Sequence, residues 1–577
     1  MEYVLITQKE DLLPLLPALM RAKVLAVDTE TTGLDPHTDR VRLIQLAAPG
    51  VPVLIIDCFR ALPECLDVIK GLLESPNVKI FQNAKFDLQF FMALDVYPYP
   101  IFDTMLAGQL LRTSDGPPRA NLAAFAGHYL SEELDKSEQI SDWRGELSDA
   151  QLTYAARDAE VLPRLREVMV KALYDNGLSK VAFTEFSCVR AVAGMEYAGV
   201  GIDAVRWERL IAKTERERDE ALSVLHTYAG EPVVQTSLWG EDVVLNHNFD
   251  SNQYILQLLR EHGIPAEATS KRNLSAYSGH PLIKALGAYR KAAKALSGFL
   301  YPIPQMIHKK TGRLHPRYGQ IGAWSGRMSC GGPNIQQIPR DANFRACFAA
   351  PPGRKFIIAD YSQIELRVAA QISGDGRMIS AYKNGEDLHA LTASLISDVP
   401  INAVTKTQRQ AAKAVNFGLI FGMGAAGLQQ YARQSYGVDM TLEQAASFRD
   451  SFRAYPGIAQ WHRRIKTDKP GEERTLLGRK FLFGENSGAA GRYNTPVQGT
   501  AADIAKSALG MLAQDIKGTS INIIAAVHDE ILLEADESEA ATAADMLKNA
   551  MEQAGNGILS DVPCVADVAI ADTWAGK

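Results

Sequence analysis

The chain has 577 residues and a formal net charge of -6, with 46% hydrophobic and 22% charged residues. This length is too great for one hydrophobic core, so we expect three or four compact units. The absence of long apolar runs and of low-complexity tracts argues against a membrane-embedded or disordered protein. The negative charge argues only weakly against nucleic-acid binding, because its distribution matters more than its total.

The six cysteines are scattered and include no Cys-x-x-Cys pair. They are typical of reduced thiols in the cytosol. The N-terminal stretch lacks the basic start of a signal peptide. We therefore expect a cytoplasmic protein, in the host cytoplasm if the source is viral, with an organelle interior as an open alternative.

Three short segments near the N-terminus present acidic side chains. A strand pattern carries Asp28 and Glu30 two positions apart, so both side chains leave the same face. A second apolar run leads to Asp87, and a helical pattern places Tyr154 and Asp158 on one face. Four acids and a tyrosine suit two divalent ions that activate a water toward a phosphodiester.

Together, in this order, these segments resemble the three exonuclease motifs of the 3′–5′ proofreading superfamily, in the version with a tyrosine in the third motif. The resemblance implies an RNase H-like exonuclease domain over residues 1–170 that is active as a nuclease. It implies catalytic and metal-binding roles for Asp28, Glu30, Asp87 and Asp158, with Tyr154 as a catalytic residue that positions the attacking water. A degenerate scaffold without activity is the alternative. We expect Asp103 to be structural.

Helical patterns dominate the next part of the chain. A long charged amphipathic helix is predicted over residues 207–228, and Ser251 or Asn252 caps the next helix. Residues 270–300 are predicted to be helical and basic. Residues 260–317 contain eleven Lys and Arg but only two acids. Such a basic stripe fits a groove for a phosphate backbone, and a solvated helix face is the alternative.

Two apolar runs further along each lead to acidic residues. Residues 355–359 predict a buried strand that delivers Asp360 at its end. Residues 521–534 predict a hairpin with Asp529 and Glu530 at its tip. Burying a lone carboxylate is costly, so strand-borne acids that meet in space make a natural site for two divalent ions acting at phosphorus.

Between these two runs, residues 407–422 predict a helix that ends at a glycine-rich stop. Arg409, Lys413 and Phe417 recur every four residues and therefore share one face. Two cations and an aromatic ring suit a nucleoside triphosphate, with charges for the phosphates and a ring for the sugar and base. A solvated helix with one core phenylalanine is the alternative.

The run Asp-Tyr-Ser-Gln-Ile-Glu-Leu-Arg from Asp360 and the run Val-His-Asp-Glu from Val527 resemble motifs A and C of the family A DNA polymerases, the bacterial DNA polymerase I type. The helix after Thr407 resembles their motif B. The resemblance implies a multidomain α/β and α+β protein, in which the exonuclease domain is followed by a right-hand polymerase domain over residues 171–577. The expected subdomains are a thumb at about 205–305, a palm at about 171–204, 306–395 and 476–577, and fingers at about 396–475.

The resemblance also implies roles for individual residues. Asp360 and Asp529 would carry the metal ions of the polymerase site, supported by Glu530 as a further catalytic acid. Nucleotide-binding residues would be Gln363, Glu365, His389, Arg409, Lys413, Phe417 and Phe421. DNA-binding residues would be Lys291, Lys294, Arg327, Gln337, Asn494, Gln498 and His528. Among these, Arg327 would check the shape of a base pair from the minor groove without choosing its sequence.

Several positions depart from the family pattern. Ser325 and Gln337 are mild changes, and Arg492 lies two residues closer to Asn494 than the family's arginine usually does.

Three further departures carry expectations. Phe421 stands where the family usually has a tyrosine whose hydroxyl bonds Glu365, so we expect Glu365 to lack that partner. Exclusion of ribonucleotides should then be weaker or differently achieved. Phe417, in place of tyrosine, implies strong discrimination against dideoxynucleotides. Trp324 is bulky where a small residue is usual, and we expect a packing substitution.

We therefore expect a template-directed, DNA-dependent DNA polymerase with 3′–5′ exonucleolytic proofreading, acting in replication or repair. Each active site would hold two Mg²⁺ ions, with Mn²⁺ as a substitute. The expected partners are primer-template DNA and deoxynucleoside triphosphates, with no membrane. We expect a monomer, and a processivity or replisome factor stays open as a partner. The chain starts at the proofreading domain, so we expect a large-fragment form without the 5′-nuclease domain, as in phage or organelle versions.

Two other classes of protein stay open. A stand-alone exonuclease of the RNase D type, with a non-catalytic C-terminal nucleic-acid-binding region, would explain residues 1–170. It would leave Asp360, Asp529 and the helix at 407–422 as coincidences. A catalytically silent nucleic-acid clamp would not need acids and cations at enzymatic positions.

Overall fold

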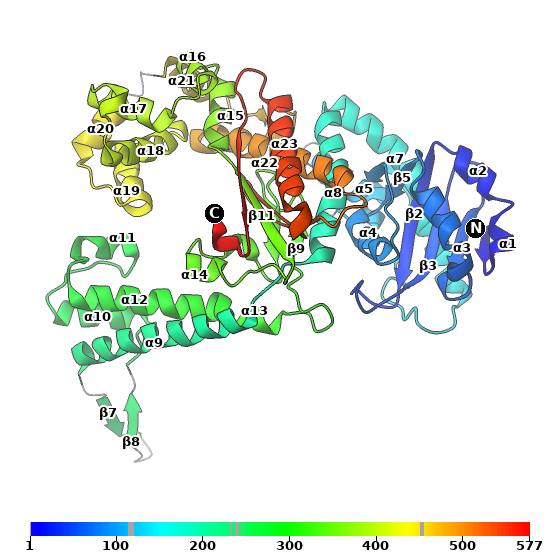
Figure 1. Ribbon diagram of the computed structural model, residues 1–577, viewed down its shortest axis with the longest axis horizontal. Coiled ribbons are helices and arrows are strands. Elements are labelled where there is room, and N and C mark those ends of the chain that lie inside the picture. The colour runs from blue at the N-terminus through cyan, green and yellow to red at the C-terminus, as the bar shows by residue number, and fades with distance from the viewer. Residues whose placement is uncertain (1, 113–119, 231–232, 237–241, 246, 451–454) are drawn as a thin grey trace.

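The structure is a computed structural model that describes residues 2–112, 120–230, 233–236, 242–245, 247–450 and 455–577. Figure 1 shows a mixed sheet with its helices (blue to cyan) beside a larger part built around a second sheet. Among the described residues, we find no helix with the length and apolar character needed to cross a membrane.

The N-terminal part contains a six-stranded sheet in the order β1-β4-β3-β2-β5-β6. Strand β2 pairs antiparallel with β3 and parallel with β5. Successive residues of β2 alternate between two hydrophobic cores, Leu25 and Val27 on one face and Ala26 on the other, because side chains of a strand leave opposite faces in turn. The strands are β1 (Tyr3–Ile6), β2 (Val24–Thr31), β3 (Val41–Ala47), β4 (Val53–Asp57), β5 (Val78–Phe81) and β6 (Ile101–Asp103).

Helices cover both faces of this sheet (Figure 1). A capping box between Ser148 and Gln151 fixes the start of the longest one, α7. Asp103 caps α5 and also accepts the backbone N–H of Ala84 at 2.8 Å, so its expected structural role is confirmed. The helices are α1 (Lys9–Leu12), α2 (Leu16–Arg21), α3 (Cys58–Leu73), α4 (Ala84–Ala93), α5 (Thr104–Leu111), α6 (Leu122–Phe125), η1 (Ala126–Leu130) and α7 (Asp149–Asp175).

The second sheet is antiparallel, in the order β14-β15-β11-β16, and its apolar strands are buried against long helices. The predicted strand before Asp360 and the predicted hairpin are both present. The turn of the hairpin is His528–Asp529, with His528 at φ +60, whereas Glu530 already belongs to β15. The elements are α8 (Ser179–Ala198), β11 (Arg354–Tyr361), α15 (Ile364–Ser373), α22 (Ala489–Asp515), β14 (Asn522–Val527), β15 (Glu530–Asp536), α23 (Ala540–Ile558) and β16 (Ala566–Ala571).

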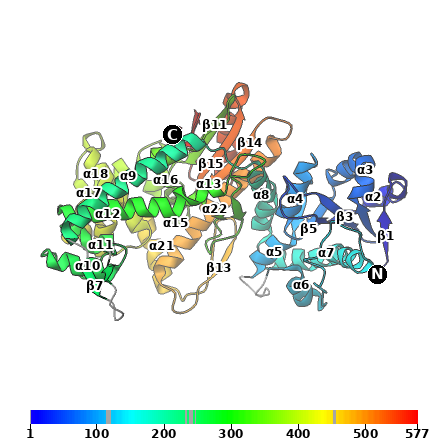
Figure 2. The same cartoon turned by 90° about the horizontal axis from the view of Figure 1, so that it is seen from below.

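Two helical lobes extend from this sheet on the side away from the N-terminal part (Figures 1 and 2). The first lobe contains α9 (Ala204–Ala229), α10 (Asn252–Glu261), α11 (Lys271–Leu274), α12 (Pro281–Ala295) and the hairpin of β7 (Val233–Thr236) with β8 (Asp242–Leu245). The second contains α16 (Gly376–Lys383), α17 (Leu388–Ser397), α18 (Lys406–Ile420), α19 (Ala425–Tyr436), α20 (Leu442–Asp450) and α21 (Pro456–Thr467).

The expectation of one helical stretch over residues 270–300 was wrong in part. Helix α11 ends at Leu274, and α12 starts only at Pro281, because proline suits the first position of a new helix and not the interior of an old one. Ser251 caps α10, which settles the choice between Ser251 and Asn252. Short elements complete the described chain: η2 (Ser275–Tyr277), η3 (Leu296–Leu300), α13 (Pro302–Gln305), β9 (Arg317–Gly319), β10 (Ser329–Gly331), η4 (Ile335–Gln337), α14 (Ala342–Arg345), η5 (Ile401–Ala403), β12 (Glu472–Arg474), β13 (Lys480–Leu482), η7 (Glu537–Glu539) and η8 (Trp574–Gly576).

A buried charge network joins α8 to α22 and to the loop before β13. Glu185 accepts from Lys506 Nζ at 2.6 Å and from Arg479, and Arg479 Nη2 also donates to Asp503 at 2.7 Å. All four side chains are almost fully buried. Burial alone would raise the pKa of Glu185, but the charges of Lys506 and Arg479 lower it. The two acids and two bases therefore stabilise one another only as a complete set.

We predict that Arg479→Met will lower the free energy of unfolding by about 3–5 kcal/mol, because it leaves two buried carboxylates with one cation. Urea unfolding of the whole chain measures this. Lys171→Met is the matched control, since the Lys171–Asp175 pair is exposed (79% and 51% of each side chain) and should contribute less than about 1 kcal/mol. Equal effects of the two substitutions would refute the network's contribution to stability.

Candidate active sites

The acids of the N-terminal part meet at one edge of its sheet. Asp28 and Glu30 lie on β2, Asp87 in the first turn of α4, and Tyr154 and Asp158 on α7. Burial, together with the negative charges of Asp28, Asp158 and Asp87, raises the pKa of Glu30 to about 9. Burial and the charge of Asp158 likewise raise the pKa of Asp28 to about 7. The structure thus brings together all five residues expected from the sequence.

A lysine that the sequence patterns did not identify completes this cluster. Lys136 Nζ donates to both carboxylate oxygens of Asp158, at 3.0 and 2.8 Å, and lies 3.5 Å from the Tyr154 hydroxyl. Asp87 accepts a 2.6 Å hydrogen bond from Thr29. Lys136 belongs to the irregular segment before α7, where no periodicity signals a function, so only the three-dimensional arrangement could reveal it.

The donor set of this cluster fits divalent metal ions. Several carboxylates that repel one another in a buried place are the oxygen ligands that Mg²⁺ and Mn²⁺ prefer, and Lys136 stands where a cation is required. As arranged here, no group of three or more His, Cys, Asp or Glu among the described residues is drawn together tightly enough to hold an ion.

A second acidic pair lies at the end of the second sheet. Asp360 ends β11, and Asp529 lies in the turn between β14 and β15. Burial raises the pKa of Asp529, and the charge of Asp360 raises it further. The ammonium of Lys577 contacts Asp360. Like the first cluster, this pair has the oxygen donors and the mutual repulsion that suit divalent cations.

Glu530 is engaged elsewhere. It lies directly across the ladder from Asp360, yet its buried carboxylate accepts from Arg345 at 3.2 Å and from the indole N–H of Trp574. These contacts hold Glu530 beside the C-terminal turn η8, while its pairing with Asp360 keeps it next to the acidic pair. Its role as a supporting acid stays a prediction.

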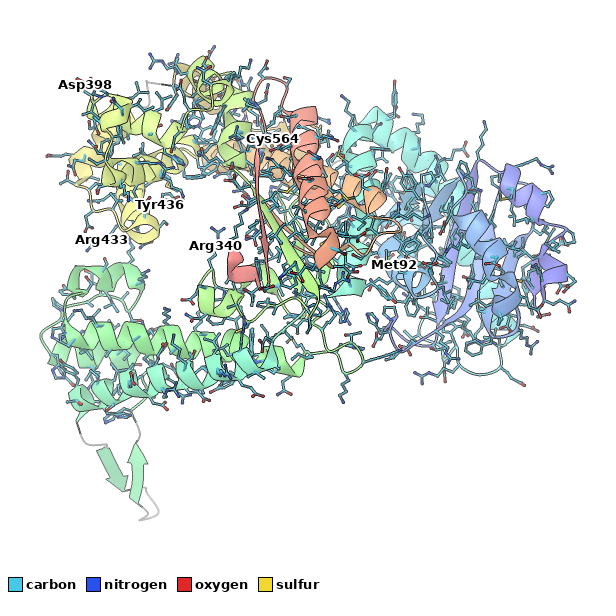
Figure 3. All side chains as sticks on the ribbon, viewed as in Figure 1. Met92, Arg340, Asp398, Arg433, Tyr436 and Cys564 are labelled. Atoms are coloured by element: carbon cyan, nitrogen blue, oxygen red, sulfur yellow. The ribbon has the colours of Figure 1, made fainter. Side chains whose placement is uncertain are left out.

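A cavity of about 440 Å³ unites residues from the second sheet, the loop before β10, and α18. Its walls combine one acid of the turn with the cationic face predicted on α18. Figure 3 shows Arg340 on the sheet side and Tyr436 on the side of α19. The lining residues are Arg327, Arg340, Gln363, Ile364, Glu365, His389, Arg409, Lys413, Phe417, Tyr436, Ala501, Ala502, His528 and Asp529.

The α18 side of the cavity is positively charged. Arg409 Nε donates to Asp387 at 2.6 Å, and Lys413 lies 5.7 Å from the ring centre of Tyr436. His389 contacts the Asn416 side chain at 3.0 Å, and burial lowers the pKa of this histidine to about 4. His389 is therefore a neutral hydrogen-bonding group at neutral pH, and Arg409 and Lys413 supply the charge.

Glu365 lacks the tyrosine hydroxyl as a partner, as expected from Phe421, but it has another partner that the sequence did not predict. Arg327 Nη2 contacts Glu365 Oε1, so the guanidinium takes the place of the missing hydroxyl. Phe421 follows α18 and packs, half-buried, against the core of the second sheet without lining the cavity. Arg327, expected to contact DNA, is thus held by an acid expected to contact the nucleotide.

The remaining residues expected to contact DNA are spread over several elements. Gln337 is exposed on η4, and Asn494 and Gln498 are half-buried on α22. Lys291 and Lys294 are exposed on α12, and Lys291 lines a second cavity of about 840 Å³ between α11, α12 and α19. Figure 3 shows Arg433 reaching from α19 toward α11.

Trp324 does not behave as a packing substitution. Its side chain is 60% exposed, and its nearest aromatic neighbour, Phe481, lies 6.2 Å away between ring centres. A bulky ring that replaced a small residue to fill a core would be buried. The expectation for this residue was therefore wrong.

Comparison with known proteins assigns both parts of the chain. Residues 210–576 match the model of DNA polymerase family A, and residues 3–174 match that of a 3′-5′ exonuclease. The chain is 33% identical to a DNA polymerase I of Aquifex aeolicus, covering 100% of both chains. It is 30% identical to DNA polymerase I of Pseudomonas aeruginosa, covering 97% of this chain but only 64% of that protein.

A solved structure resembles the whole chain. It is the polymerase domain of Pol1 from M. smegmatis in complex with DNA primer-template and dNTP, and it superposes with a TM-score of 0.80. The superposition covers 99% of each chain at 25% sequence identity.

We predict that, in EDTA, Asp28→Asn will raise the free energy of unfolding by about 1–3 kcal/mol at pH 8, because it removes one buried charge from a repelling group. Since folding raises the pKa of Asp28 from 3.8 to about 7, the folded state binds more protons between these values. Its stability therefore falls as pH rises through that window, and the advantage of Asp28→Asn should be smaller at pH 5. Urea unfolding at both pH values measures it. Exposed Asp67→Asn is the control, and an equal gain there would refute the explanation.

Proposed function

The chain belongs to DNA polymerase family A, and from this membership we propose how its own residues carry out two opposed reactions. It is a DNA-directed DNA polymerase with a 3′–5′ exonuclease domain. The membership favours this function over the stand-alone exonuclease and the silent clamp, because the family match spans residues 210–576. The observation that carries the proposal is the cavity that joins Asp529 to the cationic face of α18.

In the proposed polymerase site, Asp360 and Asp529 hold two Mg²⁺ ions, with Mn²⁺ as a substitute. Bound there, the metals would lower the pKa of the primer 3′-hydroxyl and neutralise charge on the triphosphate and the leaving pyrophosphate. Asp360 lies on β11 and Asp529 in the turn that leads into its paired strand β15, so the sheet holds the two acids near each other. The mutual repulsion of these acids supports this role, since a divalent cation relieves it.

The α18 face binds the incoming nucleotide in this proposal. Arg409 and Lys413 bind the phosphates, His389 donates a hydrogen bond to them, and the Phe417 ring packs on the sugar and base. Arg409 exchanges Asp387 for phosphate, which keeps the guanidinium paired both before and after binding. Gln363 and Glu365 line the same cavity, on the palm side.

Primer-template DNA would cross the palm between thumb and fingers. Arg327, His528 and Gln498 would meet the primer end and its minor groove, while Gln337, Asn494, Lys291 and Lys294 would contact the duplex. Phosphate contacts from exposed lysines on α12 position the duplex without reading its sequence. The basic stripe of the thumb supports this placement.

In the proposed exonuclease site, Asp28, Glu30, Asp87 and Asp158 hold two further divalent ions. Tyr154, next to Asp158 on α7, positions the attacking water, and burial together with the Asp158 charge raises the pKa of its hydroxyl. The tyrosine therefore stays protonated and donates a hydrogen bond, so it cannot be the base. A bound metal would lower the pKa of the water, and a carboxylate or the solvent would take its proton.

We further propose a monomer in the cytoplasm, divided near residue 170 into exonuclease and polymerase domains, with palm, thumb and fingers near the boundaries expected above. All six cysteines are free thiols, which fits a reducing compartment. A processivity or replisome factor stays open as a partner.

We predict that Asp529→Ala will lower the rate of primer extension at least about a thousandfold and leave degradation of single-stranded DNA within about twofold, since the metals contribute several kcal/mol at one site only. Asp28→Ala should lower the degradation of single-stranded DNA at least about a thousandfold and leave primer extension within about twofold. Labelled primers with Mg²⁺, with and without the four deoxynucleotides, measure both. Loss of both activities in either variant would contradict two separate sites, and degradation without extension by the natural protein would contradict the polymerase assignment.

We predict that Phe421→Tyr will raise discrimination against ribonucleotides about tenfold, because a new hydroxyl can donate to Glu365 and hold it against the 2′ position. The ratio of kcat/KM for a deoxynucleotide and its ribonucleotide measures this. Phe417→Tyr, the same change one turn earlier on α18, is the matched control. It should change the discrimination against dideoxynucleotides and leave the discrimination against ribonucleotides unchanged. Unchanged ribonucleotide discrimination in Phe421→Tyr would refute the prediction.

A further inference from the structure

The loop between β9 and β10 contacts both the exonuclease part and the polymerase cavity. At its start, Ile321 packs against both hydrophobic cores of the exonuclease domain. At its end, Arg327 lines the polymerase cavity. Ile321 and Arg327 are only six residues apart. The side chains between them therefore lie in the short segment that runs from the exonuclease core to the polymerase cavity.

Trp324 lies at the apex of a tight turn in this loop. The backbone N–H of Ala323 donates to Arg327 O at 3.0 Å, and that of Gly326 donates to Ala323 O at 2.9 Å. Gly326 has φ +82, a conformation that other residues rarely adopt, so the sequence supports this turn. The turn directs Trp324 outward, where 60% of the side chain is exposed.

The base of the turn is held rigidly from below. Lys506 Nζ donates to Gly326 O at 2.7 Å, and Lys506 itself belongs to the buried network with Glu185 and Arg479. A Cβ atom at Gly326 would lie 2.7 Å from Arg479 Cδ, so the backbone rests directly on that side chain. The backbone that carries the indole is therefore held in place, although little protein covers the ring itself.

An exposed indole on a held turn, three residues from Arg327 of the polymerase cavity, has a clear chemical use. Single exposed apolar residues are common and need no explanation, but most of them are not mounted on a rigid turn three residues from a predicted primer contact. Every nucleobase has an aromatic face, and stacking on a protein aromatic ring is the main way that unpaired bases are held without regard to sequence. A paired base inside a duplex offers no free face for this.

We propose that Trp324 stacks on an unpaired base at the 3′ end of the primer strand as that end passes from the polymerase site to the exonuclease site. The ligand class is a single-stranded DNA base, and the residue is a positioning residue for proofreading. The inference rests on the proposed function of the two sites. The inference adds a transient binding position between the polymerase and exonuclease sites. This position would bind only a frayed or mispaired primer end.

The test compares Trp324→Ala and Trp324→Tyr with the unsubstituted chain on three substrates. These are a duplex primer with a 3′ mismatch, a single-stranded oligonucleotide, and a matched primer with all four deoxynucleotides. We expect Trp324→Ala to lower mismatch excision about tenfold (about 1.4 kcal/mol), which lies within the range for one stacked base. Excision of single strands and extension should stay within about twofold, and Trp324→Tyr should restore mismatch excision because it keeps a ring.

Tyr174→Ala is the matched control. Its ring is 76% exposed near the end of α7, about 24 Å along the helix from Asp158, and its removal should change none of the three rates. Natural rates of mismatch excision in Trp324→Ala would overturn the proposal, as would an equal fall on single strands or a loss that Trp324→Tyr does not restore. Failure of the natural protein to excise any substrate would instead overturn the proposed exonuclease function.

Discussion

The relative placement of the two active sites depends on one buried charge network. Glu185 on α8, Arg479 before β13, and Asp503 and Lys506 on α22 are each almost fully buried, and together they carry no net charge. Gln320, at the start of the loop that leads to Arg327, donates to Glu185 at 2.5 Å. No member can be removed without leaving a buried charge unpaired. The network therefore holds α8, α22 and the loop between β9 and β10 in one arrangement.

Both active sites, in contrast, retain charges that oppose one another. Asp87 and Asp158 are buried, and Asp28 and Glu30 beside them are partly buried, as are Asp360 and Asp529 in the second site. A sequence selected for stability alone would not place carboxylates in this way, since each raised pKa records free energy lost at neutral pH. In the structure, Lys136 and Lys577 offset part of that repulsion. Sites that are locally unfavourable until a cation binds are typical of metal-dependent catalysis.

The spacing of residues along the chain correctly predicted which side chains share a face of the same strand or helix. Asp28 and Glu30 share a strand face, and Arg409, Lys413 and Phe417 share a helix face, because these positions follow from the periods of 2 and 3.6 residues. The fold class followed from the same motifs through their resemblance to a family. The contacts of Lys136, of Glu530 with Trp574 and of Arg327 with Glu365 could not be predicted, since each joins residues at least 18 positions apart. The exposure of Trp324 was missed for a related reason, because residue size indicates burial only when the neighbours are known.

These long-range contacts share a feature that explains how an acidic chain can bind a polyanion. Arg327 is held by Glu365 and Arg409 by Asp387, so two cations proposed to meet DNA or nucleotide phosphate already have an internal carboxylate partner. A phosphate that displaces such a carboxylate exchanges one charged hydrogen bond for another, which limits the desolvation cost of binding. The exchange also has a consequence for coupling. If Arg327 moved to the primer as proposed, Glu365 would lose its partner inside the nucleotide cavity and, with no hydroxyl on Phe421, would become available to the sugar of the incoming nucleotide. The proposed roles would then link occupancy of the primer site to the shape of the nucleotide site through one guanidinium.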